Sequence, residues 1–350
     1  MNIPVWLLCS IAMRANLPET NRKRIVIVGA GFAGLTLAKK LLNSNYEVVL
    51  LDRNNYHTFI PLLYQVATAG LEPESISYPI RKIFKRKKHF HFRMAELISV
   101  HPDDSYVMTD IGRINYDHLV LAHGSETNFF GNKELEKHSF NLKSSEQAME
   151  LRSYLLSQFE KAITLDERER EPYLNFVIVG AGPTGVELSG ALSELKNHIL
   201  PSDFPELDFT KMKVYLVEGM DRVLPAMSEE SSKNAEKYLK GFGVEVMLNT
   251  MVSDYDGNVA HYKMKDESSG SINTKSLVWA AGVKGSFTEG LHHEVFGKGQ
   301  RIMTDEYSKV KGTENIYTIG DLAMMKTEEF PEGHPQLAPV AMQQAEQLAE

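Results

Sequence analysis

Two stretches of the chain repeat the same order of hydrophobic and polar positions. Each begins with a short run, 24–28 and 175–179, whose last four residues are all apolar, as in a strand buried on both faces. A glycine-rich turn follows each run, and behind the turns the segments 35–42 and 186–195 carry apolar residues at helical spacing. The pattern therefore predicts strand, turn and helix twice, which is typical of a parallel α/β sheet.

Both turns have the form Gly-x-Gly-x-x-Gly, the fingerprint of a dinucleotide-binding loop. Its first Gly permits a tight bend, its second leaves room for the pyrophosphate, and its third lets the helix pack closely on the strand. The phosphates would meet free N–H groups at the positive end of the helix dipole. Because one dinucleotide needs one such loop, the chain is predicted to hold two. The glycines are Gly29, Gly31 and Gly34 in the first loop and Gly180, Gly182 and Gly185 in the second.

An acidic residue ends the next predicted strand after each fingerprint, where a carboxylate can accept hydrogen bonds from ribose hydroxyls. Asp52 follows the apolar run 48–51 at close to the usual spacing of about 20 residues. Glu218 comes later after its fingerprint, which predicts an insertion at 197–213. A carboxylate at Glu218 would repel a 2′-phosphate and so favours NADH, while Arg222 nearby keeps NADPH open.

Composition narrows the classes of function. The 350 residues suffice for two domains, and a net charge of −8 with mixed signs argues against general nucleic-acid binding. The one cysteine, Cys9, allows no disulfide framework and no mechanism through a cysteine pair, and the histidines lack metal-ligand spacing, so no metal is predicted. Residues 1–20 are interpreted as an N-terminal extension that is disordered or a translation-start artefact.

One dense charge run contains six Lys or Arg residues between Arg81 and Lys88, with Ile83 and Phe84 among them. Such a run can lie against anionic lipid headgroups. It can also be a solvated helix end whose cations offset the negative C-terminus of the dipole, which is the commoner case. Both interpretations stay open at this point.

Further motifs join the two fingerprints into one known pattern. The segments 119–125, 280–283 and 318–321 accompany the fingerprints, and more specific are 55–67 with the following 70–76, and 338–344. With these motifs the chain resembles the two-dinucleotide-binding flavoproteins and, within them, the type II, non-proton-pumping NADH:quinone oxidoreductases. The resemblance covers nearly the whole chain from Arg24 onward.

The resemblance implies an α/β fold of two doubly wound, Rossmann-like domains, the second inserted into the first as in glutathione reductase. The FAD-binding domain would comprise residues 21–171 and 283–350, and the NADH-binding domain 172–282. The segment after Gly282 should then return to the sheet that contains the strand of Asp52. A helical pattern begins near Val340 and has no stop signal before the chain ends, so a C-terminally truncated fragment is expected.

The resemblance also implies site residues. Glu187 would lie at the nicotinamide side of the flavin, and Gln343, with Gln344, at its quinone-facing side. Two positions depart from the pattern: His123 stands where the superfamily usually carries Thr, and Pro339 where the family often carries Gln. Non-covalent FAD would be held by Gly29, Gly31, Gly34, Asp52, Gly124, Gly320 and Asp321, and NADH by Gly180, Gly182, Gly185, Glu218 and Gly282.

The implied activity is that of a non-electrogenic respiratory NADH dehydrogenase, in which FAD takes a hydride from NADH and the electrons pass to menaquinone or ubiquinone. The protein would lie peripherally on the cytoplasmic side of the cell membrane, attached through a segment beyond the present C-terminus, and a homodimer is compatible with this. Three alternatives to this activity remain. The first is a sulfide:quinone reductase, although such an enzyme needs more cysteines than this chain has. The second is a reductase of a small redox protein such as ferredoxin, and the third is a non-catalytic, truncated flavoprotein. Turnover of NADH with a soluble quinone separates them.

Overall fold

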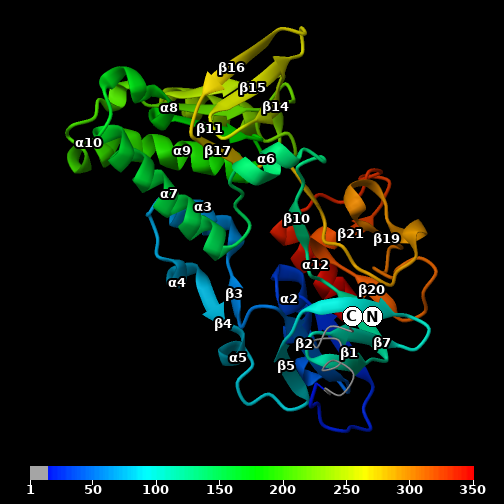
Figure 1. Cartoon of the computed structure of the whole chain (residues 1–350). Coiled ribbons are helices and arrows are strands. Elements are labelled where there is room, and N and C mark those ends of the chain that lie inside the picture. The colour runs from blue at the N-terminus through cyan, green and yellow to red at the C-terminus, as the bar shows by residue number, and fades with distance from the viewer. Residues whose placement is uncertain (1–14) are drawn as a thin grey trace, which may run out of the picture. The chain divides into compact units, whose positions relative to one another are not determined.

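The computed structural model describes residues 15–350, which form two compact units (Figure 1). Unit 1 comprises the described residues up to 57, together with 78–126 and 283–350. Unit 2 comprises 58–77 and 127–282. This division differs from the expected domain boundaries, because 58–77 and 127–171 belong to unit 2 and not to the first domain.

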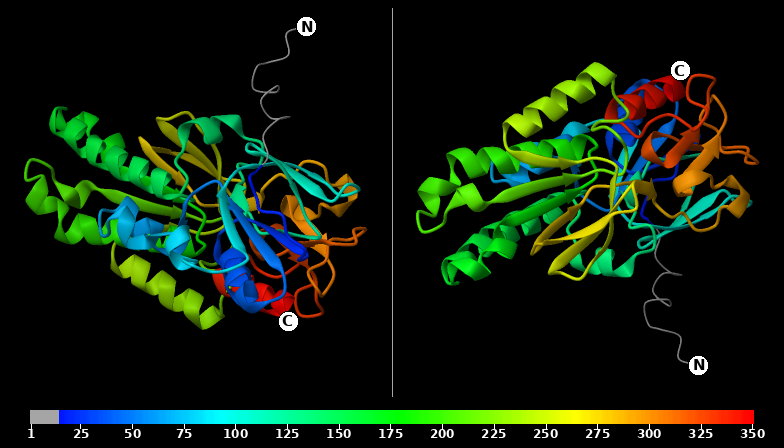
Figure 2. Two further views of the ribbon diagram at one scale, coloured as in Figure 1. Left: turned by 90° about the horizontal axis from the view of Figure 1, so that it is seen from below. Right: turned by 90° about the horizontal axis from the view of Figure 1, so that it is seen from above.

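A five-stranded parallel sheet forms the centre of unit 1, with the strand order β20-β9-β1-β2-β5. Helices α2 and α12 lie side by side on one face of this sheet (Figure 2), and the antiparallel meander β6-β7-β8 packs on the other. The helices and strands of the sheet and its covering layers are β1 (Arg24–Val28), α2 (Phe32–Lys40), β2 (Glu47–Asp52), α5 (Ile80–Ile83), β5 (Phe90–Met94), β6 (Leu97–His101), β7 (Tyr106–Thr109), β8 (Gly112–Asn115), β9 (His118–Leu121), β20 (Ile316–Thr318) and α12 (Ala338–Ala349).

Shorter strands accompany this sheet. The parallel pair of β19 (Ile302–Thr304) and β21 (Ala323–Met325) belongs to unit 1. Where the chain leaves or re-enters unit 1, it forms β3 (Tyr56–Thr58), β4 (Ser77–Pro79), β10 (Ser125–Thr127) and β18 (Val283–Gly285). Because β20 pairs with β9 beside β1 and β2, the expected return of the chain to the sheet of Asp52 is confirmed.

Unit 2 contains a four-stranded parallel sheet in the order β13-β12-β11-β17 and an antiparallel meander, β14-β15-β16. Its strands are β11 (Asn175–Val179), β12 (Lys213–Val217), β13 (Val244–Met247), β14 (Thr250–Tyr255), β15 (Val259–Met264), β16 (Ser269–Asn273) and β17 (Ser276–Trp279). Its helices are α3 (Leu63–Ala67), α4 (Pro73–Ile76), α6 (Lys133–His138), α7 (Ser145–Ile163), α8 (Glu171–Leu174), α9 (Pro183–His198), α10 (Leu200–Asp203) and α11 (Glu229–Gly241).

The two units repeat one topology. In each, the strand before the glycine turn, β1 or β11, lies between the next sheet strand and one that follows a meander. The two predicted strands have the bounds expected from the hydrophobic pattern, whereas neither meander was predicted. Burial alternates residue by residue along β7 and β8, so the period of two was present in the sequence.

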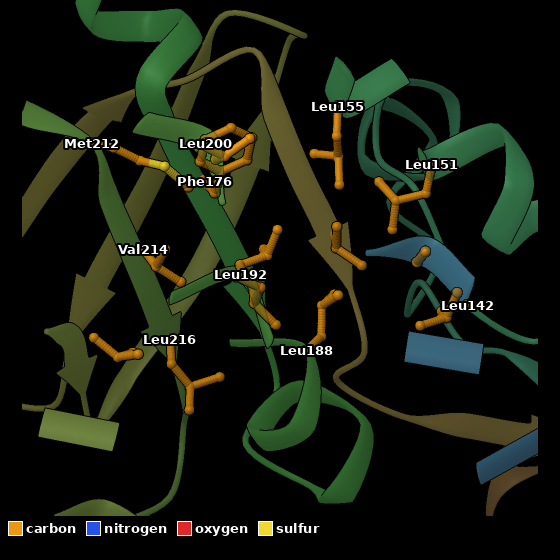
Figure 3. Close-up of a cluster of buried hydrophobic side chains, with 14 of the residues drawn as sticks. Leu142, Leu151, Leu155, Phe176, Leu188, Leu192, Leu200, Met212, Val214 and Leu216 are labelled. Atoms are coloured by element: carbon orange, nitrogen blue, oxygen red, sulfur yellow. The ribbon is translucent and has the colours of Figure 1, made fainter. Parts of the chain in front are cut away.

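The core of unit 2 explains why residues 127–171 belong there. Figure 3 shows Leu151 and Leu155 of α7 within the same apolar cluster as Leu188 and Leu192 of α9. All four side chains are buried, and burying one leucine contributes roughly 1.5–3 kcal/mol. The hydroxyl of Ser144 caps the N-terminus of α7 by accepting a hydrogen bond from the backbone of Gln147.

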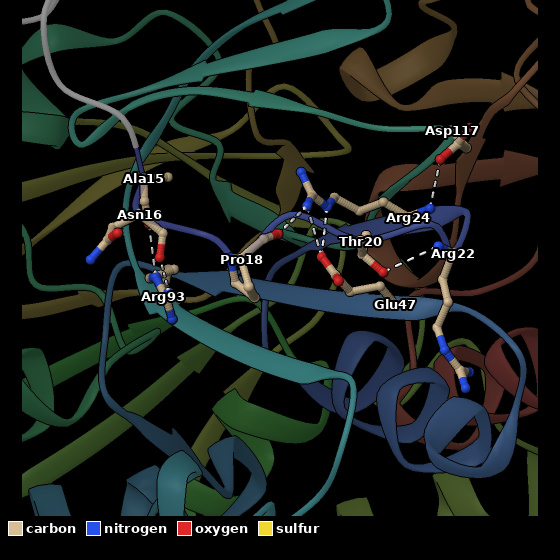
Figure 4. A network of polar contacts seen from close by, with 9 residues as sticks. All are labelled: Ala15, Asn16, Pro18, Thr20, Arg22, Arg24, Glu47, Arg93 and Asp117. Carbon is tan, nitrogen blue, oxygen red and sulfur yellow. Dashed lines mark hydrogen bonds and ion pairs between the residues drawn. The ribbon is translucent and has the colours of Figure 1, made fainter.

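Residues 15–18, the described start of unit 1, are held by hydrogen bonds, so disorder does not apply to this part of the expected extension (Figure 4). Arg93 donates hydrogen bonds to the carbonyls of Ala15 and Asn16 at 3.0 and 2.7 Å, and Arg24 donates to that of Pro18 at 3.1 Å. These guanidinium groups satisfy the backbone of 15–18, so this part does not need regular structure to be held. Residues 1–14, which include Cys9, lie outside the described residues.

Candidate nucleotide-binding sites

The three glycines of the first turn differ in what a side chain would meet at each position. Gly29 has a φ of +100°, a conformation that side chains rarely adopt. A Cβ on Gly34 would overlap the carbonyl oxygen of Gly29, so this glycine allows α2 to pack against β1. Gly31 has nothing within 4 Å of an added Cβ, which leaves open space where a ligand can approach the backbone.

The second glycine turn repeats this geometry. Gly180 has a φ of +101°, and a Cβ on Gly185 would overlap the carbonyl oxygen of Gly180. Gly182 again faces open space. The three fingerprint roles, a tight bend, an approach for pyrophosphate and close helix packing, are therefore present in both units.

The two acidic residues bind the backbone of their glycine turns in the same way. Asp52 accepts hydrogen bonds from the backbone N–H groups of Ala30 at 2.6 Å and Asn54 at 2.8 Å. Burial raises the pKa of the Asp52 carboxyl, against the opposing effect of these two hydrogen bonds. Glu218 accepts from the N–H of Ala181 at 2.6 Å. Each carboxylate oxygen keeps a second lone pair, so a ribose hydroxyl can still bind there.

The long spacing before Glu218 comes in part from the predicted insertion, which lies at 199–212 between α9 and β12 rather than at 197–213. Helix α9 has 16 residues where α2 has 9, so part of the excess is helix. The rest, 199–212, packs Leu200, Phe204 and Phe209 into the core of unit 2. Arg222, which kept NADPH open, donates a hydrogen bond to the carbonyl of Pro225 at 2.8 Å.

At the carboxyl edge of the unit 1 sheet, further candidate residues follow β9 and β20, beside the first glycine turn. The hydroxyl of Ser125, next to Gly124, donates to the carboxylate of Asp321 at 2.8 Å. Gly320 adopts a φ of +74°, and an added Cβ would lie 3.1 Å from the Cβ of Ala33 on α2. Open α/β sheets bind ligands at this edge.

The two glutamines of α12 differ in their surroundings. Gln343 is exposed, and its role stays a prediction. Gln344 is only 5% exposed, and its Oε1 accepts a hydrogen bond from the N–H of Gly320 at 2.8 Å. Gln344 therefore supports the turn that carries Asp321, a position that the sequence pattern alone did not distinguish from its neighbour. Pro339 lies in the first turn of α12, where its missing N–H is tolerated.

Glu187 lies near the start of α9, directly behind the second glycine turn. Its side chain is half-buried, and this burial raises the pKa of its carboxyl. Gly282 follows β17 in the same unit, and an added Cβ there would lie 3.2 Å from the ring of Phe130. In unit 1, the Nδ1 atom of His57 lies 2.8 Å from the carbonyl oxygen of Ala30, so this histidine adjoins the first glycine turn.

The basic run has its apolar residues turned inward. Phe84 is buried and stacks on Phe90 with ring centroids 4.0 Å apart, and the guanidinium of Arg81 lies over the ring of Phe92. Ile83 packs against the same cluster, while the six cations are exposed. Phe84 is buried and Ile83 is partly buried within unit 1, so the solvated interpretation is favoured.

Comparison with known proteins agrees with this geometry. Residues 23–345 match the family described as pyridine nucleotide-disulphide oxidoreductase. The chain is 33% identical to a type II NADH:quinone oxidoreductase of Mycobacterium tuberculosis, covering 94% of this chain and 72% of the relative. It is 30% identical to that of Staphylococcus aureus, covering 94% and 81%. The fold also matches the structure of NDH2 from Plasmodium falciparum in complex with NADH, with a TM-score of 0.85, 21% identity, and coverage of 94% and 82%.

Proposed function

Since this chain belongs to the pyridine nucleotide-disulphide oxidoreductase family and, within it, to the type II NADH:quinone oxidoreductases, we propose that it oxidises NADH and reduces a quinone through a bound flavin. The observation that carries the proposal is the pair of glycine turns. In each turn the second glycine borders open space, and a carboxylate accepts a hydrogen bond from the backbone of the turn. Two dinucleotides, one resident and one exchanging, match two such turns.

The residues of unit 1 fit a flavin dinucleotide. Open space at Gly31 suits a pyrophosphate at the N-terminus of α2, and the Asp52 carboxylate suits the adenosine ribose. Two buried nitrogens, His123 Nδ1 and Gln344 Nε2, have no hydrogen-bond partner among the described residues. Buried polar atoms are rarely left unpaired, so this unit offers polar contacts to a ligand. FAD is the flavin that these features favour over a mononucleotide.

Unit 2 would bind NADH through its own turn. Gly182 leaves the approach to α9 open, and Glu218 offers a carboxylate to the adenosine ribose. The same charge repels a 2′-phosphate, and Arg222 is engaged with a carbonyl of its own loop, so NADH is preferred to NADPH.

A bound flavin supplies the chemistry that no side chain can: it accepts a hydride from NADH and passes electrons to a quinone. The residues of the chain bind, orient and shield the reactants. Glu187, whose raised pKa favours the protonated form compared with an exposed glutamate, would hold a proton on the nicotinamide side. Gln343 would contact the quinone, while Gln344 keeps the Gly320 turn in place.

A lipid-soluble quinone requires access to a membrane, and we place the enzyme peripherally on the cytoplasmic face. In the part of the chain that the structure describes, no helix is both long and apolar enough to cross a bilayer. The attachment would be to the membrane surface, and a homodimer would be compatible with it.

The test is steady-state NADH oxidation by the purified chain with menadione or a short-chain ubiquinone as the acceptor. Quinone-dependent turnover is expected, with kcat/KM for NADH well above that for NADPH. Reduction of the flavin without turnover of any quinone would indicate a non-catalytic flavoprotein. Turnover restricted to a small iron–sulfur protein would indicate a redox-protein reductase.

A further inference from the structure

His123 stands at the carboxyl edge of the unit 1 sheet, two residues after β9. A Cβ added to Gly29 would lie 2.6 Å from the Cα of His123, so the backbone of His123 forms one wall of the first glycine turn. The histidine therefore borders the place that the proposed function gives to the flavin dinucleotide. The proposed function counts its Nδ1 among the polar atoms that unit 1 offers to a ligand, but assigns it no ligand group.

The two nitrogens of the ring differ in their hydrogen bonding. Nε2 lies 3.1 Å from the hydroxyl of Thr288, a residue only 2% exposed that follows β18. Nδ1 is buried without a hydrogen-bond partner of ordinary geometry in the described part of the chain. Such a nitrogen is unfavourable unless a ligand or a water completes its hydrogen bonding.

The second glycine turn shows which residue stands at the position that corresponds to His123. In unit 2, a Cβ added to Gly180 would approach the Cα of Ala281 at 2.6 Å, as one on Gly29 approaches His123. Ala281 and His123 thus occupy matching places beside the two turns. Because the same wall is built with a methyl group in unit 2, the imidazole is not required for the backbone geometry of the turn.

The ring is neutral at physiological pH. Burial lowers the pKa of His123 to about 4, opposed by a hydrogen bond to the backbone of Ser286 and assisted by the charge of Arg53. A neutral imidazole carries one N–H and one lone pair. With Nε2 committed to Thr288, Nδ1 can offer either a donor or an acceptor, depending on the tautomer, but no charge.

We propose that His123 is a binding residue for the flavin dinucleotide of unit 1, which it contacts through Nδ1 while Thr288 holds the ring through Nε2. The inference rests on the proposed function. Sugar hydroxyls are the ligand groups that fit, because they both donate and accept hydrogen bonds and so match either tautomer. A phosphate would instead favour a charged partner.

The experiment measures FAD affinity of apoprotein prepared from the full chain, by quenching of flavin fluorescence. His123→Ala, which copies the counterpart Ala281, should raise the Kd about tenfold, as expected for one lost hydrogen bond. Thr288→Val should raise it less, about threefold, because the ring stays but is no longer fixed. The matched control is His118→Ala, at the other end of β9, which should leave the Kd within about twofold.

A second readout separates binding from a merely structural role. In histidine-selective ¹⁵N spectra, the Nδ1 signal of His123 should shift when FAD is added to the apoprotein, and that of His118 should not. An unchanged Nδ1 signal, or equal Kd values for His123→Ala and the wild type, would overturn the inference. If the wild-type apoprotein itself does not bind FAD, the proposed function fails as well. If the wild type binds FAD and turns over but either His123 result is negative, only the role of His123 is lost.

Discussion

The Oε2 atom of Glu218 accepts a hydrogen bond of 2.6 Å from the backbone N–H of Ala181, inside the second glycine turn. Asp52 and Ala30 have the same relationship, at the same distance, in the first turn. Each acid therefore fixes its own glycine turn, in addition to the ribose contact that the proposed function gives it. A change at either acid should affect one nucleotide and spare the other.

Replacement of Glu218 tests this separation. Glu218→Gln removes the charge that strengthens the hydrogen bonds to Ala181 and to a ribose hydroxyl, so the KM for NADH should rise about tenfold or more. The loss of repulsion should also narrow the preference for NADH over NADPH. Steady-state kinetics with both coenzymes measure these effects. Asp52→Asn is the control, since it should weaken flavin retention; an unchanged NADH/NADPH ratio in Glu218→Gln would contradict the assignment.

The glycines of the first turn should differ sharply in what an added methyl group does. Gly34→Ala would drive a Cβ into the carbonyl of Gly29, so we expect a misfolded or strongly destabilised chain. Gly31→Ala meets no protein atom within 4 Å, so the chain should fold but lose flavin. Circular dichroism and flavin absorbance per chain distinguish the two outcomes. A Gly31→Ala protein with full flavin content would show that the pyrophosphate lies elsewhere.

The neighbouring glutamines of α12 should separate stability from activity. Gln344→Ala leaves the N–H of Gly320 without its partner, which costs about 1–3 kcal/mol of unfolding free energy. Gln343→Ala changes an exposed side chain, so its effect on stability should stay within about 0.5 kcal/mol. Urea unfolding measures the first effect, and the KM for quinone measures any effect of Gln343. Equal destabilisation by both substitutions would be inconsistent with the structure.

His123 should make the stability of the apoprotein depend on pH. Its pKa is about 4 in the folded chain and about 6.5 when unfolded, so the unfolded chain binds the extra proton between these values. The stabilisation is present above pH 6.5 and is lost as the pH falls towards 4. Between pH 7 and pH 5 this histidine should account for about 2 kcal/mol of lost unfolding free energy. Urea titrations of the wild type and His123→Ala at pH 7 and pH 5 measure this loss of unfolding free energy. The same loss in both proteins would show that His123 is not its source.

The sequence predicted those parts of the fold that have a local signal. The runs 24–28 and 175–179 became β1 and β11, because a buried parallel strand is uniformly apolar and a glycine fingerprint marks its end. The placement of 127–171 in unit 2 could not be predicted, because it depends on which core receives Leu151 and Leu155. Similarly, the contrast between Gln343 and Gln344 depends on the packing of α12 against the Gly320 turn, which spacing does not reveal.

Departures from the expected pattern are visible in the sequence, but their consequences are not. His123 stands out as unusual, yet only the structure shows one ring nitrogen on Thr288 and the other without a hydrogen bond of ordinary geometry among the described residues. The order of residues 15–18 likewise comes from donors distant in sequence, Arg24 and Arg93. Long-range polar contacts of this kind leave no periodic trace in the chain.

An anaerobic titration with NADH tests the central claim most directly, that one chain holds a flavin dinucleotide in unit 1 and takes hydride from NADH bound to unit 2. The purified, FAD-loaded chain should show the visible absorption of oxidised flavin, which should bleach with one equivalent of NADH and return when a quinone is added. A flavin absorption that NADH leaves unchanged, or a chain that stays colourless after reconstitution with FAD, would contradict the account.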